Sequence, residues 1–244
     1  MTRMVVCGVL AVATLMAPAA GGAQSNPAPA QHEGAFAPVA QGEQIENLDA
    51  LKREVRRYHD CTCTCGCYAK DLDTQADRAI AYLQRRTAHR GSREKLALVL
   101  DIDETTLSNW EEMSTAGFAY DKKGFDTWVD SAAAPAIPAT LRLYREAERL
   151  EVHVFFLTGR SETQRAVTER NLRSRGFAAW DGLILRSPEE AALTAQAYKT
   201  AERVALVAKG YDIVLNVGDQ WSDLRGKAQA EYSVKYPDPY YFIP

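Results

Sequence analysis

The sequence predicts a doubly wound α/β fold, in which a parallel sheet carries helices on both faces. Four short apolar runs are the first observation, at residues 96–100, 152–157, 183–185 and 213–217. Runs this short and this apolar are typical of strands buried on both faces of a parallel sheet. Stretches with helical spacing lie between them, at residues 138–150, 162–175 and 199–209. Strands and helices therefore alternate, which indicates the α/β class.

The composition is that of an ordinary globular protein. Of the 244 residues, 46% are apolar and 25% are charged, and the formal net charge is −3. These values exclude a collagen-like, a fully disordered or a polytopic membrane chain. The balanced charge also argues against a nucleic-acid-binding protein, because phosphate contacts need a basic face. The length fits one domain with a good core, and two small domains are the alternative.

The first 44 residues are expected to lie outside the folded domain, which we place at 45–244. Arg3 precedes an apolar run at 4–16, and small residues follow up to Ala23, which is the layout of a secretory signal peptide. We expect cleavage after Ala23, export to the periplasm or the medium, and no membrane attachment afterwards. An uncleaved anchor is the weaker alternative, because a spanning helix needs roughly 20 apolar residues. Residues 24–44 are expected to form a flexible leader.

Two further segments frame the predicted core. Residues 45–92 carry helical patterns at 47–59 and 68–89 and form a helical preface. Residues 110–138 lack a strand pattern and form a small insert after the first core strand, placed to overhang a site there. The insert contains the aromatic residues Trp110, Phe118, Tyr120, Phe125 and Trp128. They form either the insert's own small core or a surface on which a nucleobase or aryl group stacks, with Trp110 and Tyr120 as candidate substrate contacts.

An acidic motif, Asp101-Ile-Asp-Glu-Thr105, follows the first predicted strand directly. In doubly wound sheets, ligands bind beyond the carboxyl ends of the strands. Two carboxylates as close as Asp101 and Asp103 can hold a divalent cation, or one can act as a nucleophile while the other moves protons. Acidic loops are common, so the motif alone indicates little. Its position directly after a buried strand is what favours a functional site.

The second predicted strand ends in Thr158-Gly159-Arg160. Thr158 offers a hydroxyl group, and Gly159 lets backbone N–H groups approach an anion. The alternative is a simple turn in which Ser161 caps a helix. Arg160 is either a substrate contact or the partner in a structural ion pair.

Two more charged positions come later in the chain. Lys199 is expected to open the helix before the fourth strand, although a single lysine is usually just solvated. Gly218-Asp-Gln-Trp-Ser-Asp223 supplies two carboxylates, Asp219 and Asp223, at a strand-to-helix junction. The alternative for Asp219 is that it caps the helix.

Taken in order, these four motifs resemble the haloacid-dehalogenase (HAD) superfamily of phosphohydrolases. The runs 101–109 (DIDETTLSN) and 218–224 (GDQWSDL) are similar to its acid phosphatase subfamily, IIIB, which includes bacterial secreted acid phosphatases and plant vegetative storage proteins. The tail at 236–244 is similar to the end of the plant members. The resemblance covers roughly residues 48–244 and implies a HAD-like Rossmannoid fold.

The resemblance implies how the phosphoryl group is handled. Asp101 is the nucleophile that takes this group, while Asp103 protonates the leaving oxygen and later deprotonates water. Thr158, Gly159 and Lys199 bind the phosphoryl oxygens. An Asp nucleophile is ionised at acid pH, because its unperturbed pKa is about 3.9. Asp103 must be protonated in the first step, which favours an acid optimum if its pKa is raised.

The resemblance also implies a Mg²⁺ cofactor. Its ligands are Asp101, the backbone carbonyl of Asp103 and Asp219, and Asp223 is a further acidic position that binds the metal directly or through water. A phosphate monoester dianion repels a carboxylate nucleophile. Mg²⁺ and the Lys199 ammonium together cancel this repulsion and the charge on the transition state.

Four cysteines lie within seven residues, at Cys61, Cys63, Cys65 and Cys67. In an exported protein an even number of cysteines favours disulfides, although ring closure across Cys-x-Cys is strained. A soft metal such as Zn²⁺ or Cu⁺ and the absence of a defined role are the alternatives. The family resemblance gives no reason to expect this cluster.

The sequence therefore predicts a secreted or periplasmic Mg²⁺-dependent acid phosphatase that forms an aspartyl-phosphate. Its substrates are expected to be small phosphomonoesters, with nucleotides as one alternative, and neither nucleic acid nor a membrane is expected as a partner. A catalytically silent storage or ligand-binding homologue is the first rival. A metal- or redox-handling protein that works through the cysteines 61–67 is the second.

Overall fold

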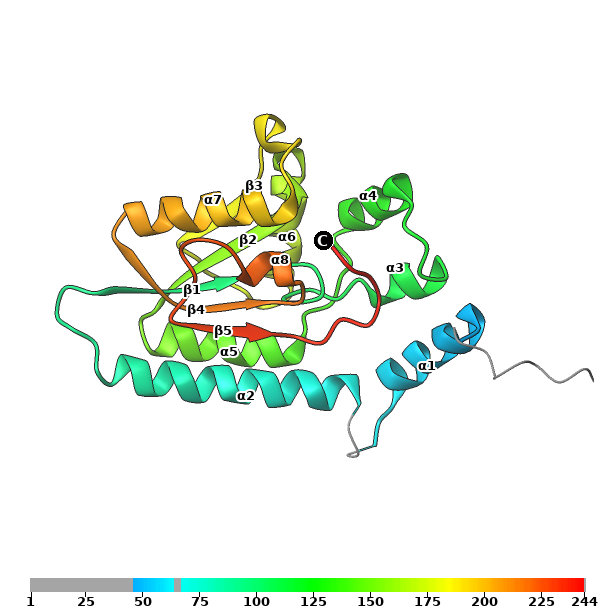
Figure 1. Cartoon of the computed structure of the whole chain (residues 1–244), viewed down its shortest axis with the longest axis horizontal. Helices are drawn as coiled ribbons and strands as arrows, with labels where there is room; N and C mark the ends of the chain where they lie inside the picture. The colour runs from blue at the N-terminus through cyan, green and yellow to red at the C-terminus, as the bar shows by residue number, and fades with distance from the viewer. Residues whose placement is uncertain (1–45, 64–66, 244) are drawn as a thin grey trace, which may run out of the picture. The chain divides into compact units, whose positions relative to one another are not determined.

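The computed structural model describes residues 46–63 and 67–243. The expected signal peptide with its cleavage after Ala23, and the leader at 24–44, lie outside these residues. The described chain is built on a five-stranded parallel sheet with the strand order β3-β2-β1-β4-β5 (Figure 1). The strands are β1 (Lys95–Leu100), β2 (His153–Ser161), β3 (Gly182–Arg186), β4 (Tyr211–Gly218) and β5 (Tyr232–Lys235). The predicted α/β class is confirmed.

The four predicted apolar runs are β1 to β4, whereas the fifth strand was not predicted. In β5 only Val234 is buried, so this strand shows no continuous apolar run. It lies at the edge of the sheet and pairs only with β4, from Leu215 opposite Tyr232 to Gly218 opposite Lys235. Strand β2 also runs further than predicted, through Thr158 to Ser161.

The longer helices match the predicted helical stretches, with two differences. The helices are α1 (Leu48–Asp60), α2 (Tyr68–Thr87), α3 (Trp110–Thr115), α4 (Lys122–Ser131), α5 (Pro138–Arg149), α6 (Arg165–Ser174), α7 (Ala195–Ala208) and α8 (Trp221–Leu224). A 3-10 turn at Glu162–Gln164 precedes α6. The expectation that Lys199 opens its helix is wrong, because the Thr194 side chain caps α7 by accepting from the backbone N–H of Ala197.

Helices cover both faces of the sheet, with α2 and α5 on one face and α7 on the other (Figure 1). Alternate side chains of β1 point to opposite faces. Leu98 and Leu100 pack in the core with α2 and α5, whereas Ala97 and Val99 pack against α7. The apolar face of α2 has helical spacing, with Leu72, Ala76, Ala79 and Leu83 buried. Among residues 46–63 and 67–243, no helix has both the length and the apolar character needed to cross a bilayer.

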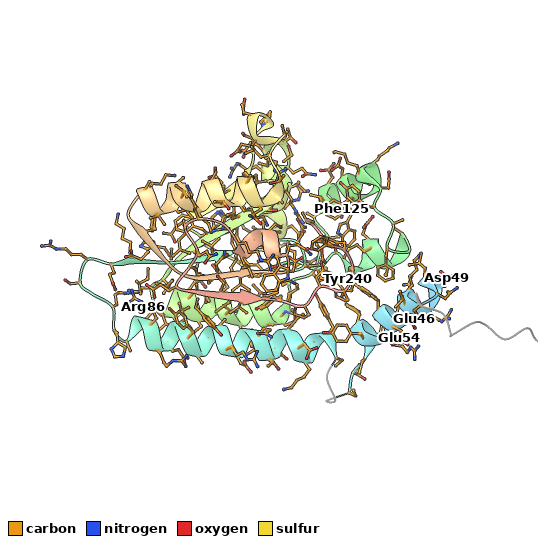
Figure 2. All side chains as sticks on the ribbon, viewed as in Figure 1. Glu46, Asp49, Glu54, Arg86, Phe125 and Tyr240 are labelled. Carbon is orange, nitrogen blue, oxygen red and sulfur yellow. The ribbon has the colours of Figure 1, made fainter. Side chains whose placement is uncertain are left out.

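The insert and the preface meet through aromatic side chains. The Trp110 ring stacks on His59 of α1 with centroids 3.6 Å apart, and lies 5.2 Å from the ring of Tyr240 in the C-terminal tail. Trp110 and Phe118 thereby join the main core, so the interpretation of these two as a separate core of the insert is wrong. Figure 2 shows Tyr240 at the end of the sheet where α1 and α3 lie, with Arg86 at the opposite end.

Candidate active site

The loop after β1 holds Asp101 at the carboxyl end of the sheet. The backbone N–H of Asp101 donates to Val217 in β4 at 3.0 Å, which extends the sheet pairing to this residue. The Thr106 hydroxyl donates to the backbone carbonyl of Asp101 at 2.6 Å. Glu104 takes a positive φ of 56°, so the chain turns sharply within the acidic motif. These contacts therefore fix the position of Asp101 at the end of a buried strand.

Three carboxylates from different segments meet at this end of the sheet. Oxygen atoms of Asp101, Asp219 and Asp223 lie within 4.8 Å of one another, and all three residues are buried. Asp101 follows β1 and Asp219 follows β4, and these strands are neighbours in the sheet. Asp223 reaches the same place from α8, where it packs over Gly218. A Cβ atom at Gly218 would lie 2.4 Å from the Asp223 side chain, so only glycine fits there.

Lys199 joins this carboxylate cluster from the buried side of α7. Its Nζ atom donates to Asp101 Oδ1 and to Asp223 Oδ1, each at 2.5 Å. Burial by itself would lower the pKa of Lys199, but the two carboxylates raise it overall, so the ammonium stays charged. Lys199 is 6% exposed, which contradicts the interpretation of a solvated surface lysine.

Burial raises the pKa of the Asp101 carboxyl well above its usual value, and although Lys199 opposes this shift, Asp223 reinforces it. The pKa of Asp219 is also raised, first by burial and then by repulsion from Asp223. Asp219 accepts hydrogen bonds from the Thr105 hydroxyl at 2.9 Å and from the Gln220 amide at 2.8 Å. Both donors are neutral, and within residues 46–63 and 67–243 no ion pair to Asp219 is formed. A bound cation would offset the repulsion among these three carboxylates and favour their charged forms.

Asp103 lies apart from the three-carboxylate cluster and pairs with Arg160. Arg160 Nη2 donates to Asp103 Oδ1 at 2.6 Å, and the Arg160 side chain is only 2% exposed. Asn109 Nδ2 donates to the same oxygen at 2.9 Å. Arg160 was expected to be either a substrate contact or the partner in an ion pair, and in this structure it forms the ion pair.

The pKa of Asp103 is lowered, so the condition under which this residue would favour an acid optimum is not met. Burial by itself would raise this pKa, but Arg160 and the hydrogen bond from Asn109 bring it below the usual value. Without substrate, Asp103 is therefore a carboxylate at mildly acid pH.

Thr158 and Gly159 lie near the end of β2, which is the neighbour of β1 in the sheet. Thr158 is fully buried, and its hydroxyl oxygen accepts from the backbone N–H of Arg160 at 3.2 Å. A Cβ atom at Gly159 would meet nothing within 4 Å, which leaves open space in front of its backbone. Ser161 caps the following 3-10 turn, because its hydroxyl accepts from the backbone N–H of Thr163. The predicted capping role of Ser161 is therefore confirmed. Capping by Asp219 is wrong, because Gln220 is the N-cap residue of α8.

Two buried amide side chains that orient these groups, those of Asn109 and Gln220, were not predicted from the sequence. Asn109 donates to Asp103 and to Glu104, and its own Oδ1 accepts from the Trp128 indole of the insert at 2.8 Å. Gln220 contacts Asp219 and the tail residue Asp238. Asn109 and Gln220 both lie within the motifs at 101–109 and 218–224. An amide residue within an acidic motif could therefore have indicated a side chain that orients the carboxylates.

The two candidate substrate contacts in the insert lie in different surroundings. The Trp110 ring is occupied by its stacking with His59, as described above. Tyr120 is 78% exposed, and its ring centroid lies 6.1 Å from that of Phe125. Among the described residues, neither side chain forms a hydrogen bond with Asp101, Asp103, Asp219 or Asp223.

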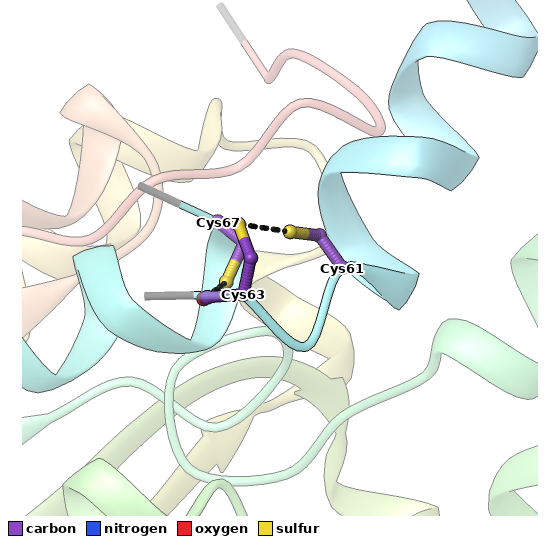
Figure 3. A group of neighbouring side chains, drawn as sticks. All are labelled: Cys61, Cys63 and Cys67. Atoms are coloured by element: carbon purple, nitrogen blue, oxygen red, sulfur yellow. Dashed lines mark hydrogen bonds between the residues drawn. The ribbon is translucent and has the colours of Figure 1, made fainter. Parts of the chain in front are cut away.

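The cysteines form a local cluster between α1 and α2 (Figure 3). The sulfur atoms of Cys61, Cys63 and Cys67 lie within 4.8 Å of one another, and Cys65 is outside the described residues. Cys61 Sγ is 2.9 Å from Cys63 Sγ, and the Cys67 thiol donates to the backbone carbonyl of Cys63 at 3.1 Å. Cys61 and Cys67 are free thiols.

A parallel α/β sheet with Asp-x-Asp after its central strand, a buried lysine and further aspartates after the next strand defines a HAD-like protein. The family model of the HAD superfamily, subfamily IIIB (acid phosphatase), matches residues 23–244. The chain belongs to this family. The match begins before residue 48, so it extends further toward the N-terminus than the sequence motifs indicated.

Curated relatives agree with this assignment. Acid phosphatase 1 of Solanum lycopersicum is 40% identical over 179 residues, which are 72% of this chain and 69% of the relative. Vegetative storage protein 1 of Arabidopsis thaliana is 33% identical over 205 residues, or 82% of this chain and 74% of that protein. A class C acid phosphatase from Bacillus anthracis, solved with tungstate bound, shares the fold. Its TM-score is 0.65 at 24% identity, over 80% of this chain and 86% of that chain.

Proposed function

We propose that this protein hydrolyses small phosphomonoesters, with Asp101 as the phosphoryl acceptor. The observation that carries the proposal is the buried ammonium of Lys199 between the carboxylates of Asp101 and Asp223. A carboxylate can attack a phosphate dianion only where positive charge offsets their repulsion. Membership of the acid phosphatase family and the tomato relative support the same activity.

The carboxylate cluster fits a divalent cation with a preference for oxygen ligands, and we propose Mg²⁺. Asp101, Asp219 and Asp223 offer three oxygen ligands within 4.8 Å of one another. Oxygen-only donor sets suit Mg²⁺, which keeps several waters in its shell. When bound, the ion supplies Lewis-acid stabilisation of the phosphoryl oxygens.

The chain's own residues account for the two steps of the reaction. Lys199 engages Asp101 Oδ1, which leaves Oδ2 to attack phosphorus. The bond from Asp101 to phosphorus forms as the ester P–O bond breaks, and the leaving oxygen takes a proton from Asp103. In the second step water attacks phosphorus and gives a proton to Asp103, and the bond to Asp101 breaks. We propose that Thr158 and the backbone of Gly159 bind the phosphoryl oxygens.

The ion pair with Arg160 keeps the pKa of Asp103 low, so Asp103 needs a further influence to gain its proton. An incoming phosphoryl group brings negative charge beside this pair, and nearby negative charge raises the pKa of a carboxyl group. Substrate binding therefore promotes protonation of Asp103 at the stage that needs an acid.

The rival function is storage or ligand binding without turnover, since two vegetative storage proteins are among the relatives. The presence of both Asp101 and Asp103, each held in a defined position, favours the enzyme. We further propose export by the signal peptide at 1–23, a small-molecule substrate, and no nucleic acid or membrane partner.

The test is hydrolysis of an aryl phosphate near pH 5 to 6 by the full chain, with Mg²⁺ and with EDTA. Asp101→Asn is expected to lower kcat by roughly 10³-fold or more, because the nucleophile is lost. Asp130→Asn, an exposed carboxylate of α4, is the matched control and should retain full activity. Absence of turnover in folded wild-type protein would favour the storage function, and turnover unaffected by Asp101→Asn would refute the assigned nucleophile.

A further inference from the structure

The buried side chain of Gln220 links the C-terminal tail to Asp219 of the carboxylate cluster. Gln220 is 4% exposed and follows Asp219 directly at the end of β4. Its Nε2 atom donates to Asp219 Oδ2 at 2.8 Å and to Asp238 Oδ2 at 2.6 Å. Its Oε1 atom accepts from the backbone N–H of Ile243 at 3.0 Å. Both ends of this amide are therefore held.

These contacts permit one orientation of the amide. With the opposite assignment, Oε1 would face the carboxylates of Asp219 and Asp238, and Nε2 would face the N–H of Ile243. Each contact would then join two acceptors or two donors, so the hydrogen-bond network fixes the assignment. The two hydrogens of the amide nitrogen go to the nearer oxygens of Asp219 and Asp238, while the Tyr241 carbonyl lies further away, at 3.4 Å.

The tail segment that contacts Gln220 is itself fixed to the sheet. The backbone N–H of Tyr236 donates to Gly218 at 2.9 Å, and Tyr236 is fully buried. Asp238 Oδ1 accepts from the backbone N–H of Tyr240 at 2.8 Å. Asp238 thus presents its second oxygen to Gln220 from a closed turn.

We propose that Gln220 is a positioning residue that, clamped by Asp238 and the Ile243 backbone, sets the orientation of Asp219 for a divalent cation. This inference rests on the proposed function of Asp219 as a metal ligand. Asp219 Oδ1 is held by the Thr105 hydroxyl and Oδ2 by Gln220. The carboxylate plane is therefore fixed from both sides, with an oxygen of Asp219 within 4.8 Å of oxygens of Asp101 and Asp223.

The test measures binding of Mn²⁺, as a spectroscopic probe, to the full chain by EPR of the free ion. Gln220→Ala is expected to weaken Mn²⁺ binding about 10- to 100-fold, the usual effect of losing a group that orients a metal ligand. Gln84→Ala is the matched control, because it removes an amide that donates to Glu146 at 2.6 Å on the exposed surface of α2. It should leave the Kd for Mn²⁺ unchanged.

Turnover provides a readout that general structural damage would not produce. If Gln220 acts through Asp219, saturating Mg²⁺ should restore most of the kcat of Gln220→Ala. A Kd within twofold of wild type, or a kcat that excess cation does not restore, would overturn the inference. Asp238→Ala, expected to weaken Mn²⁺ binding severalfold in the same direction, provides the test if Gln220→Ala does not fold.

The two proposals fail in different ways. If wild-type protein binds Mn²⁺ and loses turnover with Asp101→Asn, the proposed function holds whatever Gln220→Ala does. If folded wild-type protein binds no Mn²⁺, both the metal site and the role of Gln220 are refuted.

Discussion

The carboxylate cluster at the end of the sheet and the cysteine cluster between α1 and α2 are assembled in opposite ways. Each brings three potential metal ligands within 4.8 Å. The carboxylates come from segments far apart in the chain, and Lys199 reaches Asp101 across 98 residues. The cysteines lie two and four residues apart, and their contacts with one another stay within this short connection.

This difference shows how strongly each cluster depends on the fold. Asp101 and Asp219 meet because β1 and β4 are adjacent strands. The hydrogen-bond partners of Asp219, Thr105 and Gln220, are themselves buried. The cysteine cluster includes Cys61 and Cys63, which are partly or fully exposed, and needs no sheet to form. We therefore expect packing changes to damage the carboxylate cluster severely and the loss of the cysteines to matter little.

Among the changes that test this comparison, Gly218→Ala is expected to have the largest effect, because it disrupts the packing of the carboxylate cluster. The new Cβ would lie 2.4 Å from the Asp223 side chain, which must then move away from Lys199. We expect kcat to fall about 100-fold and unfolding free energy to fall by about 1–3 kcal/mol. Gly91→Ala meets only ordinary contacts, at 3.5 Å, and is the matched control. Activity close to wild type in Gly218→Ala would show that the position of Asp223 is unimportant.

A smaller effect is expected from Arg160→Gln, which tests the pH dependence of the same site. Arg160 lowers the pKa of Asp103, so its removal raises this pKa and Asp103 keeps its proton to higher pH. The descending basic limb of the kcat profile should therefore move to higher pH. Arg165→Gln, which removes an exposed pair with Glu162, should leave the limb in place. An unchanged or lowered limb in Arg160→Gln would contradict the role of Asp103 as general acid.

The smallest effect is expected when all four cysteines of 61–67 are changed to serine. The carboxylate cluster has no contact with Cys61, Cys63 or Cys67 among the hydrogen bonds described. We expect kcat/KM to stay within about twofold of wild type, measured beside thermal unfolding. A large loss of activity in the folded variant would instead favour the metal- or redox-handling function.

The central strands and the reactive residues were predictable because their signals are local. Each of β1 to β4 contains a short, mainly apolar run, and Asp101, Thr158 and Asp219 lie at or just after the ends of such runs. Parallel strands bring these ends to one edge of the sheet, so the order of the motifs sufficed to place them together.

The remaining features depend on tertiary contacts that leave no local pattern. β5 has one buried residue and exists by pairing with β4. The helix of Lys199 begins earlier than predicted because Thr194 caps it. The pKa of Asp103 is lowered by Arg160, a partner 57 residues away, which no motif around Asp103 indicates.

The central claim is that Asp101 carries the phosphoryl group during turnover. The most direct measurement is an acid quench of wild-type protein during hydrolysis of an aryl phosphate, followed by borohydride reduction and peptide mass spectrometry. Borohydride converts an aspartyl-phosphate to homoserine, so the account predicts homoserine at position 101 and an unmodified Asp103. Turnover with modification at another residue, or with none at Asp101, would contradict it.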